Sequence, residues 1–337
     1  MNKSRIASVS SFLLLFLSFF CAIKFGAEKV PLKAVFGLGG KFDNIILWDL
    51  RLPRAILAAV TGVLLGGSGA VFQMFFRNPL AEPGIMGISS GATLGAVAAT
   101  MFSAGLPAMA ASDAVKKKLF SVVSPINLSA FIGALCAGAF VTFLAFTKAG
   151  RRSSIMLLLC GTALGTLYSS ISSILILSTD KEFHAIYTWI LGSFNGRGWK
   201  ELLFIIIPSS VSIIIMFSIT GALDLLSCGE TTASSLGVEV HHLRILVLVS
   251  GALAISAAVC AGGTIGFVGL IAPHIVRSLL GPKSRILIPF SMVFGAVLLL
   301  ISDTIARVII APAELPTGLI TSILGVPFFI SLCLKEK

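Results

Sequence analysis

The stretch AILAAVTGVLLGGSGAVFQMFF, residues Ala55–Phe76, contains no charged side chain over 22 consecutive positions. An α-helix rises about 1.5 Å per residue, so a helix of this length extends about 33 Å and can cross the roughly 30 Å hydrocarbon core of a bilayer. Inside lipid every backbone N–H and C=O group must be paired, and a single helix does this within its own segment. We therefore predict a membrane-spanning helix here.

The same pattern recurs along the whole chain. Hydrophobic residues make up 56% of the 337 positions and charged residues only 12%, about half the charge of a soluble domain. The seventh apolar run is too long for one crossing, and its Gly262, Gly263 and Pro273 favour a turn, so we divide it near Gly263. This predicts an all-α, polytopic membrane protein with ten spans and both termini on one side. The nine runs are Ile6–Ile23, Ala55–Phe76, Pro83–Ser112, Leu119–Thr147, Ser153–Thr179, Leu202–Leu223, Ile245–Val276, Ile286–Ser302 and Leu315–Leu334.

The chain is expected to form one domain, a single transmembrane unit over residues 1–337. No linker rich in proline or serine and no low-complexity tract divides it. Lys3 and Arg5 precede an apolar stretch, as in a signal peptide, but no small-residue cleavage site follows. We therefore expect a retained first helix.

The net charge of +11 does not point to nucleic acid, because lysines and arginines gather in the loops of membrane proteins. They divide about equally between the two sides of the ten-span topology, so charge alone leaves the orientation open. The six cysteines show no CxxC spacing and lie mostly in apolar runs, which indicates neither a disulfide framework nor a metal site.

Motifs for ATP hydrolysis and for zinc-dependent peptide hydrolysis are absent from the sequence. There is no GxxxxGK[ST] loop and no HExxH, and the glycine-rich segment Gly262–Gly266 lacks the lysine that reaches a phosphate. We expect a transport protein that is not itself an enzyme and that binds no cofactor of its own.

Transport driven by an ion gradient requires titratable groups within the membrane. Only His274 among the histidines lies in an apolar run, and Asp303, which directly follows one, is the candidate among the acids. Arg307 follows Asp303 by one helical turn, a spacing that favours a structural ion pair. An ion-coupled secondary carrier that uses Asp303 and His274 stays open as the alternative, and so does a membrane scaffold.

One loop, Leu223–Arg244, is partly amphipathic. Leu225, Leu226, Leu236 and Val238 alternate with acidic and hydroxyl side chains. A short helix at the membrane surface or against a partner has this pattern, and so does a solvated loop. Elsewhere, small residues crowd several spans, which favours close helix packing over a pore lining.

Several motifs together resemble the FecCD permease family, whose members import ferric siderophores, haem and vitamin B12. They occur in the family's order over nearly the whole chain. They are Arg51–Arg54, Arg77–Gly84, Leu159–Gly161, Trp189–Phe194, Ser235–Val238, Gly266–Arg277, Asp303 with Ala306 and Arg307, and Glu314–Gly318 with Gly325–Phe329.

The resemblance implies the fold of a vitamin-B12-type permease, a type II ABC importer with ten transmembrane helices. It also implies a homodimer or close heterodimer, two separate ATPase subunits that bind ATP and Mg, and an extracytoplasmic substrate-binding protein. The protein is then expected in the bacterial inner membrane with both termini in the cytoplasm.

The resemblance assigns roles to four groups of residues in this chain. Those that dock the binding protein are Arg51, Arg54 and Arg307. Those that contact the ATPase lie in the loop at about 223–244 and are Glu230, Ser235, Leu236, Gly237 and Val238. Those at the cytoplasmic gate are Asn78, Leu80, Ser153 and Ser154. Those that line the pathway are Gly161, Thr162, Gly165, Thr166 and Ser169.

The substrate is not fixed by these residues. A ferric siderophore is expected first, as the commonest cargo of the family, with haem or cobalamin next. The loop Leu106–Leu119 is longer and richer in lysine than the family pattern. We hypothesise that Lys116–Lys118 extend the basic docking surface. Neutralising them is expected to weaken affinity for the binding protein and to reduce its salt dependence.

Overall fold

The computed structural model describes residues 3–28, 30, 31, 33, 39–103, 124–147, 154–178 and 183–335. Its regular structure is helical, with no β-strand in these ranges. In chain order the elements are α1 (Lys3–Lys24), α2 (Lys41–Asn44), the π-helix η2 (Ile45–Arg51), α3 (Leu52–Phe75), the 3₁₀-helix η3 (Pro83–Met86), α4 (Ile88–Ser103), α6 (Pro125–Ala145), α8 (Ser154–Leu177), α9 (Phe183–Ile190), α10 (Trp199–Ser218), α11 (Thr220–Leu226), α12 (Glu230–Ser235), α13 (Val240–Gly262), α14 (Val268–Leu280), α15 (Ser284–Val308) and α16 (Thr317–Lys335).

The described helices include membrane spans, as the sequence predicts. Six helical stretches are long and apolar enough to cross a bilayer: Lys41–Phe75, Pro125–Ala145, Ile155–Leu177, Trp199–Ser218, Val240–Gly262 and Ser284–Val308. Four more apolar helices are shorter: Val9–Lys24, Ile88–Met101, Val268–Leu280 and Thr317–Ser331. The all-helical, multi-span class is therefore confirmed.

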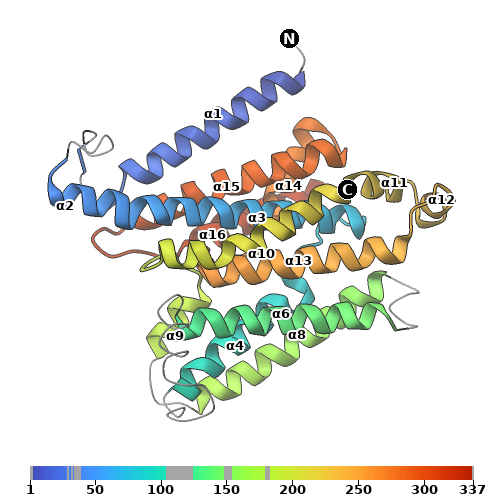
Figure 1. Ribbon diagram of the computed structural model, residues 1–337, viewed down its shortest axis with the longest axis horizontal. Coiled ribbons are helices and arrows are strands. Elements are labelled where there is room, and N and C mark those ends of the chain that lie inside the picture. Colours follow the sequence, from blue (N-terminus) through green and yellow to red (C-terminus); the bar gives the residue numbers. More distant parts are fainter. Residues whose placement is uncertain are drawn as a thin grey trace.

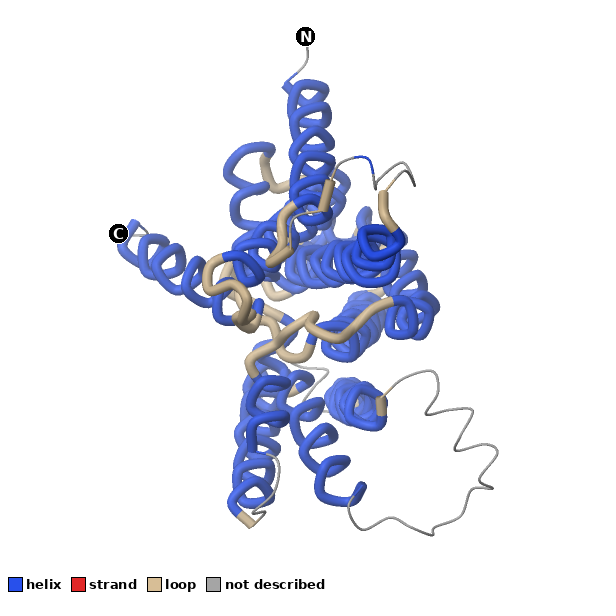
Figure 2. Tube along the Cα trace, turned by 90° about the vertical axis from the view of Figure 1, so that its left-hand side faces the viewer, coloured by secondary structure: helices blue, strands red, loops and turns tan. Residues whose placement is uncertain are grey.

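The long helices run roughly along one axis and form two groups on either side of α13 (Figure 1). Helices α4, α6, α8 and α9 make one group, and α1, α3, α14 and α15 lie on the other side. Helix α13 packs against both α6 and α3. A view along the long axis shows several helices end-on (Figure 2). Both chain termini lie in the half of Figure 1 that carries α11 and α12.

The long seventh apolar run divides where the sequence predicts. Helix α13 ends at Gly262 and α14 begins at Val268. Gly263 has a φ of +73°, and a Cβ atom there would lie 2.4 Å from the carbonyl oxygen of Trp189. Glycine is required because a side chain would have no room in this left-handed turn. The break near Gly263 is confirmed.

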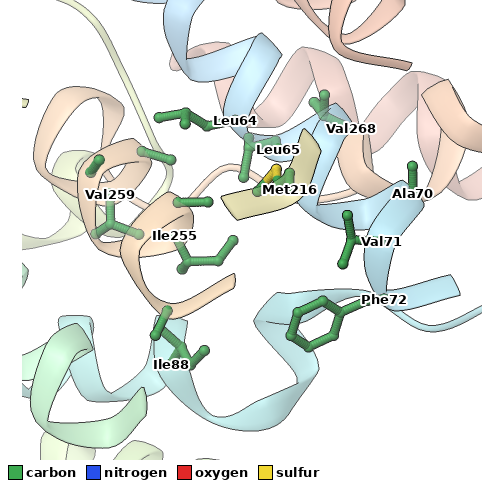
Figure 3. Close-up of a cluster of buried hydrophobic side chains, with 14 of the residues drawn as sticks. Leu64, Leu65, Ala70, Val71, Phe72, Ile88, Met216, Ile255, Val259 and Val268 are labelled. Atoms are coloured by element: carbon green, nitrogen blue, oxygen red, sulfur yellow. The ribbon is translucent and has the colours of Figure 1, made fainter. Parts of the chain in front are cut away.

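The apolar core lies where five helices meet. Figure 3 shows Phe72 of α3, Ile88 of α4, Met216 of α10, Ile255 of α13 and Val268 of α14 converging there. Phe72, Met216 and Val268 are fully buried. This core holds the two groups of helices together.

Helices α3 and α15 pack with their backbones in contact. A Cβ atom on Gly62 would lie 2.3 Å from the carbonyl oxygen of Gly295, and one on Gly66 would lie 2.2 Å from that of Ser291. Small residues allow this close approach, since packing holds helices together where lipid offers no hydrophobic drive. The small residues of the second predicted span therefore serve packing.

Candidate functional site

A buried cluster of charges joins the start of α3 to the end of α15. Arg54 Nη2 lies 2.8 Å from Asp303 Oδ1, and Arg54 Nη1 lies 2.8 Å from Glu314 Oε2. Arg307 Nε lies 3.1 Å from Asp303 Oδ2, one helical turn away on α15. The hydroxyl of Thr317 donates to Asp303 Oδ1 at 3.1 Å. The Asp303 carboxylate thus accepts hydrogen bonds from Arg54 and Thr317 and forms an ion pair with Arg307, as a buried carboxylate requires.

Three arginine side chains cap the C-terminal ends of helices by hydrogen bonding to their last carbonyl groups, a role that the sequence did not reveal. Arg51 donates to the carbonyl oxygens of Ile23 and Lys24 in α1, at 3.1 and 2.9 Å, and also to that of Glu28. Arg307 donates to the carbonyl of Ala22 at 2.8 Å. Arg197 donates to that of Cys260 in α13 at 3.2 Å. The last carbonyls of a helix lack intrahelical partners, and cations stabilise that end.

The three arginines predicted to dock a binding protein therefore have partners inside the chain. Arg51, Arg54 and Arg307 are only 6%, 7% and 4% exposed. The cluster reaches the surface through Glu314, whose side chain is 24% exposed. The structure brings Arg54, Arg307 and Asp303 together, whereas the docking role stays a prediction.

The predicted gate segment follows α3 in a tight turn. Arg77 adopts a left-handed φ of +49°. Asn78 Oδ1 accepts a hydrogen bond from the backbone N–H of Leu80 at 2.9 Å, which closes an Asx turn. Both Asn78 and Leu80 are half-buried. Ser153 lies outside the described residues, and Ser154 is the first residue of α8. Of the second half of the predicted gate, the structure therefore describes Ser154 alone.

A cavity of about 350 Å³ is lined by Glu82 and Gly84, which follow the gate residues in the chain. Glu82, Ser89 and Thr264 supply its polar lining, together with apolar residues of α3 and α13. Glu82 lies within the Arg77–Gly84 motif, to which the sequence assigned no acidic role. The available signal was an acidic residue followed by proline in a chain that has only 14 acidic residues.

Helix α8 has a packed face and an open face. Gly161 and Gly165 are buried against η3 and Gly87: a Cβ on Gly161 would lie 2.8 Å from the Met86 Cα. Thr166 and Ser169 are exposed, and Thr162 is half-buried. Of the residues predicted to line a pathway, the two glycines pack inside the chain and the three hydroxyl residues remain accessible. Their contact with a cargo stays a prediction.

The loop between the sixth and seventh predicted spans folds into α11 and α12. Gly237 has a φ of +87°, and the N–H of Val238 donates to the carbonyl of Ala233 at 3.0 Å. Leu236 is 59% exposed although it is apolar. It lines a groove of about 410 Å³ together with Leu225, Val238 and His242. Glu230, which begins α12, is half-buried, and Ser235, which ends it, is exposed.

An exposed leucine beside an apolar groove is typical of a binding surface. In contrast, no group of three or more His, Cys, Asp and Glu side chains in the described ranges is arranged to hold a metal ion. The ring of His274 packs edge-on against Phe328, with centroids 5.6 Å apart.

The bundle of long apolar helices defines a polytopic membrane protein. Residues 13–335 match the FecCD transport family, and the chain belongs to it. It is 36% identical to the iron(3+)-hydroxamate import system permease protein FhuG of Bacillus subtilis, over 100% of this chain and 98% of that one. It is 38% identical to the cobalamin import system permease protein BtuC of Halobacterium salinarum, over 86% of this chain and 73% of that one.

A solved structure has the same fold. It is described as an inward-facing conformation of a putative metal-chelate type ABC transporter, with a TM-score of 0.83 and 31% identity over 97% of this chain and 98% of that one. The family resemblance seen in the sequence motifs is confirmed.

Proposed function

We propose that this chain is the membrane-spanning permease subunit of an ATP-binding-cassette importer that carries an iron chelate. The observation that carries the proposal is the family match across residues 13–335. The full-length similarity to a solved metal-chelate type transporter supports it. A relative named for hydroxamate import is 36% identical to the chain, and one named for cobalamin import is 38% identical. A ferric siderophore is the first cargo to test, and haem and cobalamin follow.

The proposed topology has ten spans with both termini in the cytoplasm of a bacterium. The six long and four shorter apolar helices support that number. Shorter helices such as α14 need not cross the bilayer alone, because broken helices are tolerated where other helices surround them. Both termini lie toward α11 and α12 (Figure 1), the elements proposed to meet the ATPase.

The proposed assembly contains a second permease copy, two ATPase subunits and an extracytoplasmic binding protein. ATP and Mg bind to the ATPase, because this sequence lacks the phosphate-binding loop. Thr162, Thr166 and Ser169 on the open face of α8 suit a pathway that moves a bulky chelate without holding it tightly. Asn78 and Leu80 form one half of its cytoplasmic gate. The Arg54 and Arg307 cluster, with Arg51, stands at the docking face.

The alternative carrier mechanism is disfavoured by the contacts of Asp303. This residue is 1% exposed and contacts Arg54, Arg307 and Thr317. Its carboxylate is thus already occupied by two guanidinium groups and one hydroxyl of the same chain. A structural ion pair accounts for Asp303 better than a proton relay does.

We expect Leu236→Asp to lower ATP-driven uptake by about tenfold or more, because a carboxylate in an apolar contact must be desolvated without a partner. Uptake into proteoliposomes and co-purification of the ATPase are the measurements. Leu236→Met is the matched control and should keep both. If the Leu236→Asp variant kept full uptake, the proposal that this groove contacts the ATPase would be contradicted.

The proposed function itself is tested by uptake in proteoliposomes that contain the permease with its cell's ATPase. Radioactive ferric siderophore, haem and cobalamin are offered in turn, each with its binding protein. We expect uptake of one cargo that is lost with a catalytically dead ATPase. Uptake that ignores ATP but follows a proton gradient would contradict the proposal.

A further inference from the structure

We propose that Asp224 is a positioning residue that attaches the coupling segment, Leu223–Arg244, to α15. Helices α15 and α3 together then connect this segment to the buried charge cluster at the other side of the membrane. The link is a property of the folded chain alone. Its use in transport rests on the proposed function.

The first end of the link is a pair of hydrogen bonds between α11 and the start of α15. The backbone N–H of Ser284 donates to Asp224 Oδ1 at 2.7 Å. The hydroxyl of Ser284 donates to the carbonyl of Thr220, also at 2.7 Å. Ser284 is fully buried. The first N–H groups of a helix lack intrahelical partners, and a carboxylate there is favoured by the helix dipole. Asp224 therefore fixes α11 to the beginning of α15.

The second end is the charge cluster, farther along the same helix. Asp303 follows Ser284 by 19 positions in the 25-residue helix α15, which corresponds to about 28 Å. This distance is close to the thickness of a bilayer core. Pro289 removes one backbone hydrogen bond near the start of the helix. Asp303 then contacts Arg54 at the beginning of α3, and Arg307 contacts α1.

Between these ends, α15 cannot slide freely along α3. The backbone contacts of Gly62 with Gly295 and of Gly66 with Ser291 leave no space for a shift without overlap. Close-packed interfaces respond to a displacement by moving together or by changing to another discrete packing. Helices α3 and α15 therefore act as one body, with the cluster at one end and Asp224 at the other.

Hydrogen–deuterium exchange on the full chain in lipid nanodiscs tests the link without any partner protein. We expect Asp224→Ala to raise amide exchange in residues 220–227 by about tenfold, the effect of losing a hydrogen bond to a charged group. Asp224→Asn keeps the Oδ1 acceptor and should restore most of the protection. Ser218→Ala is the control, because that hydroxyl bonds only to Ile215 of its own helix.

Glu314→Gln then disturbs the cluster at its exposed edge. We expect it to raise exchange in residues 220–227 of the wild-type chain but to add nothing in the Asp224→Ala chain, since the connection is already broken there. Asp303→Asn is a second, stronger disturbance at the same end. If neither cluster variant changed the amide exchange rate of residues 220–227, the link would be overturned. If the cluster variants raised this exchange equally in the wild-type chain and in the Asp224→Ala chain, the positioning role of Asp224 would be overturned.

The transport consequence is measured separately, in proteoliposomes that contain the complete importer. We expect Asp224→Ala to lower ATP-driven uptake about tenfold while ATPase co-purification persists, and Asp224→Asn to restore uptake. Normal uptake by Asp224→Ala would overturn the role in transport. If the unaltered chain showed no ATP-driven uptake, the proposed function would fail, whereas the exchange result would still decide the structural link.

Discussion

Replacing Asp303 by alanine is expected to lower the free energy of unfolding by about 3–5 kcal/mol. The side chain is 1% exposed and contacts Arg54 and Arg307 at 2.8 and 3.1 Å. Without it, the buried guanidinium groups of Arg54 and Arg307 lose the carboxylate that pairs with both of them, and an uncompensated buried charge is costly. Unfolding by SDS in mixed micelles, followed by tryptophan fluorescence, gives the change.

Glu314→Gln is the matched control for this prediction. Glu314 also contacts Arg54 at 2.8 Å, but its side chain is 24% exposed. Solvent screens such a pair, so we expect a loss below about 1 kcal/mol. A double variant, Asp303→Leu with Arg54→Leu, should lose less than the sum of its single variants, because removing both partners leaves less buried charge. An Asp303→Ala loss as small as that of Glu314→Gln would show that the cluster contributes little to stability.

The second large effect is expected at the contact between α3 and α15. Gly62→Val places a side chain where a Cβ atom would lie 2.3 Å from the carbonyl oxygen of Gly295. The neighbour is backbone and cannot rotate away, so the helices must separate. We expect a loss of about 3 kcal/mol or more, the upper range of overpacking effects. The same SDS titration measures it, and size-exclusion chromatography checks that the protein remains monodisperse.

Gly221→Ala is the matched control, since Gly221 of α11 has open space around its Cα. Alanine favours a helix over glycine, so this variant should gain about 0.5–1 kcal/mol. If Gly62→Val retained the stability of the unaltered chain, α3 and α15 would not form the tight unit inferred from their backbone contacts.

The internal contacts of the arginines refine the proposed docking mechanism. A binding protein that docks on this face meets Glu314 first, since its side chain is more exposed than those of Arg54 and Asp303. Charge-assisted pairs to arginine are strong and directional. Docking through Arg54 therefore requires an incoming carboxylate to compete with partners that the chain already supplies.

The sequence by itself determined the membrane class, the helical architecture and the family. Charge-free runs long enough to cross a bilayer permit little besides helices, because lipid offers the backbone no hydrogen-bonding partner. The glycines near Gly263 indicated a break that the structure places between Gly262 and Val268. The spacing of Asp303 and Arg307 indicated an ion pair, and these side chains lie 3.1 Å apart in the structure. The spans, the break and the ion pair each depend on residues close together in the chain, and each family motif is itself a short local stretch.

The tertiary structure alone decided which partners distant residues have. Arg54 meets Asp303 across 249 positions of sequence, and Arg307 meets Ala22 across 285. The resemblance assigned Gly161 and Gly165 to the pathway lining, and a family motif does not tell which face of a helix is covered by its neighbours. Their burial against η3 and Gly87 follows from how α4 and α8 pack. The sequence determines local periodicity and hydrogen bonding within a helix, whereas the pairing of helix faces depends on shape and charge contributed by several segments at once.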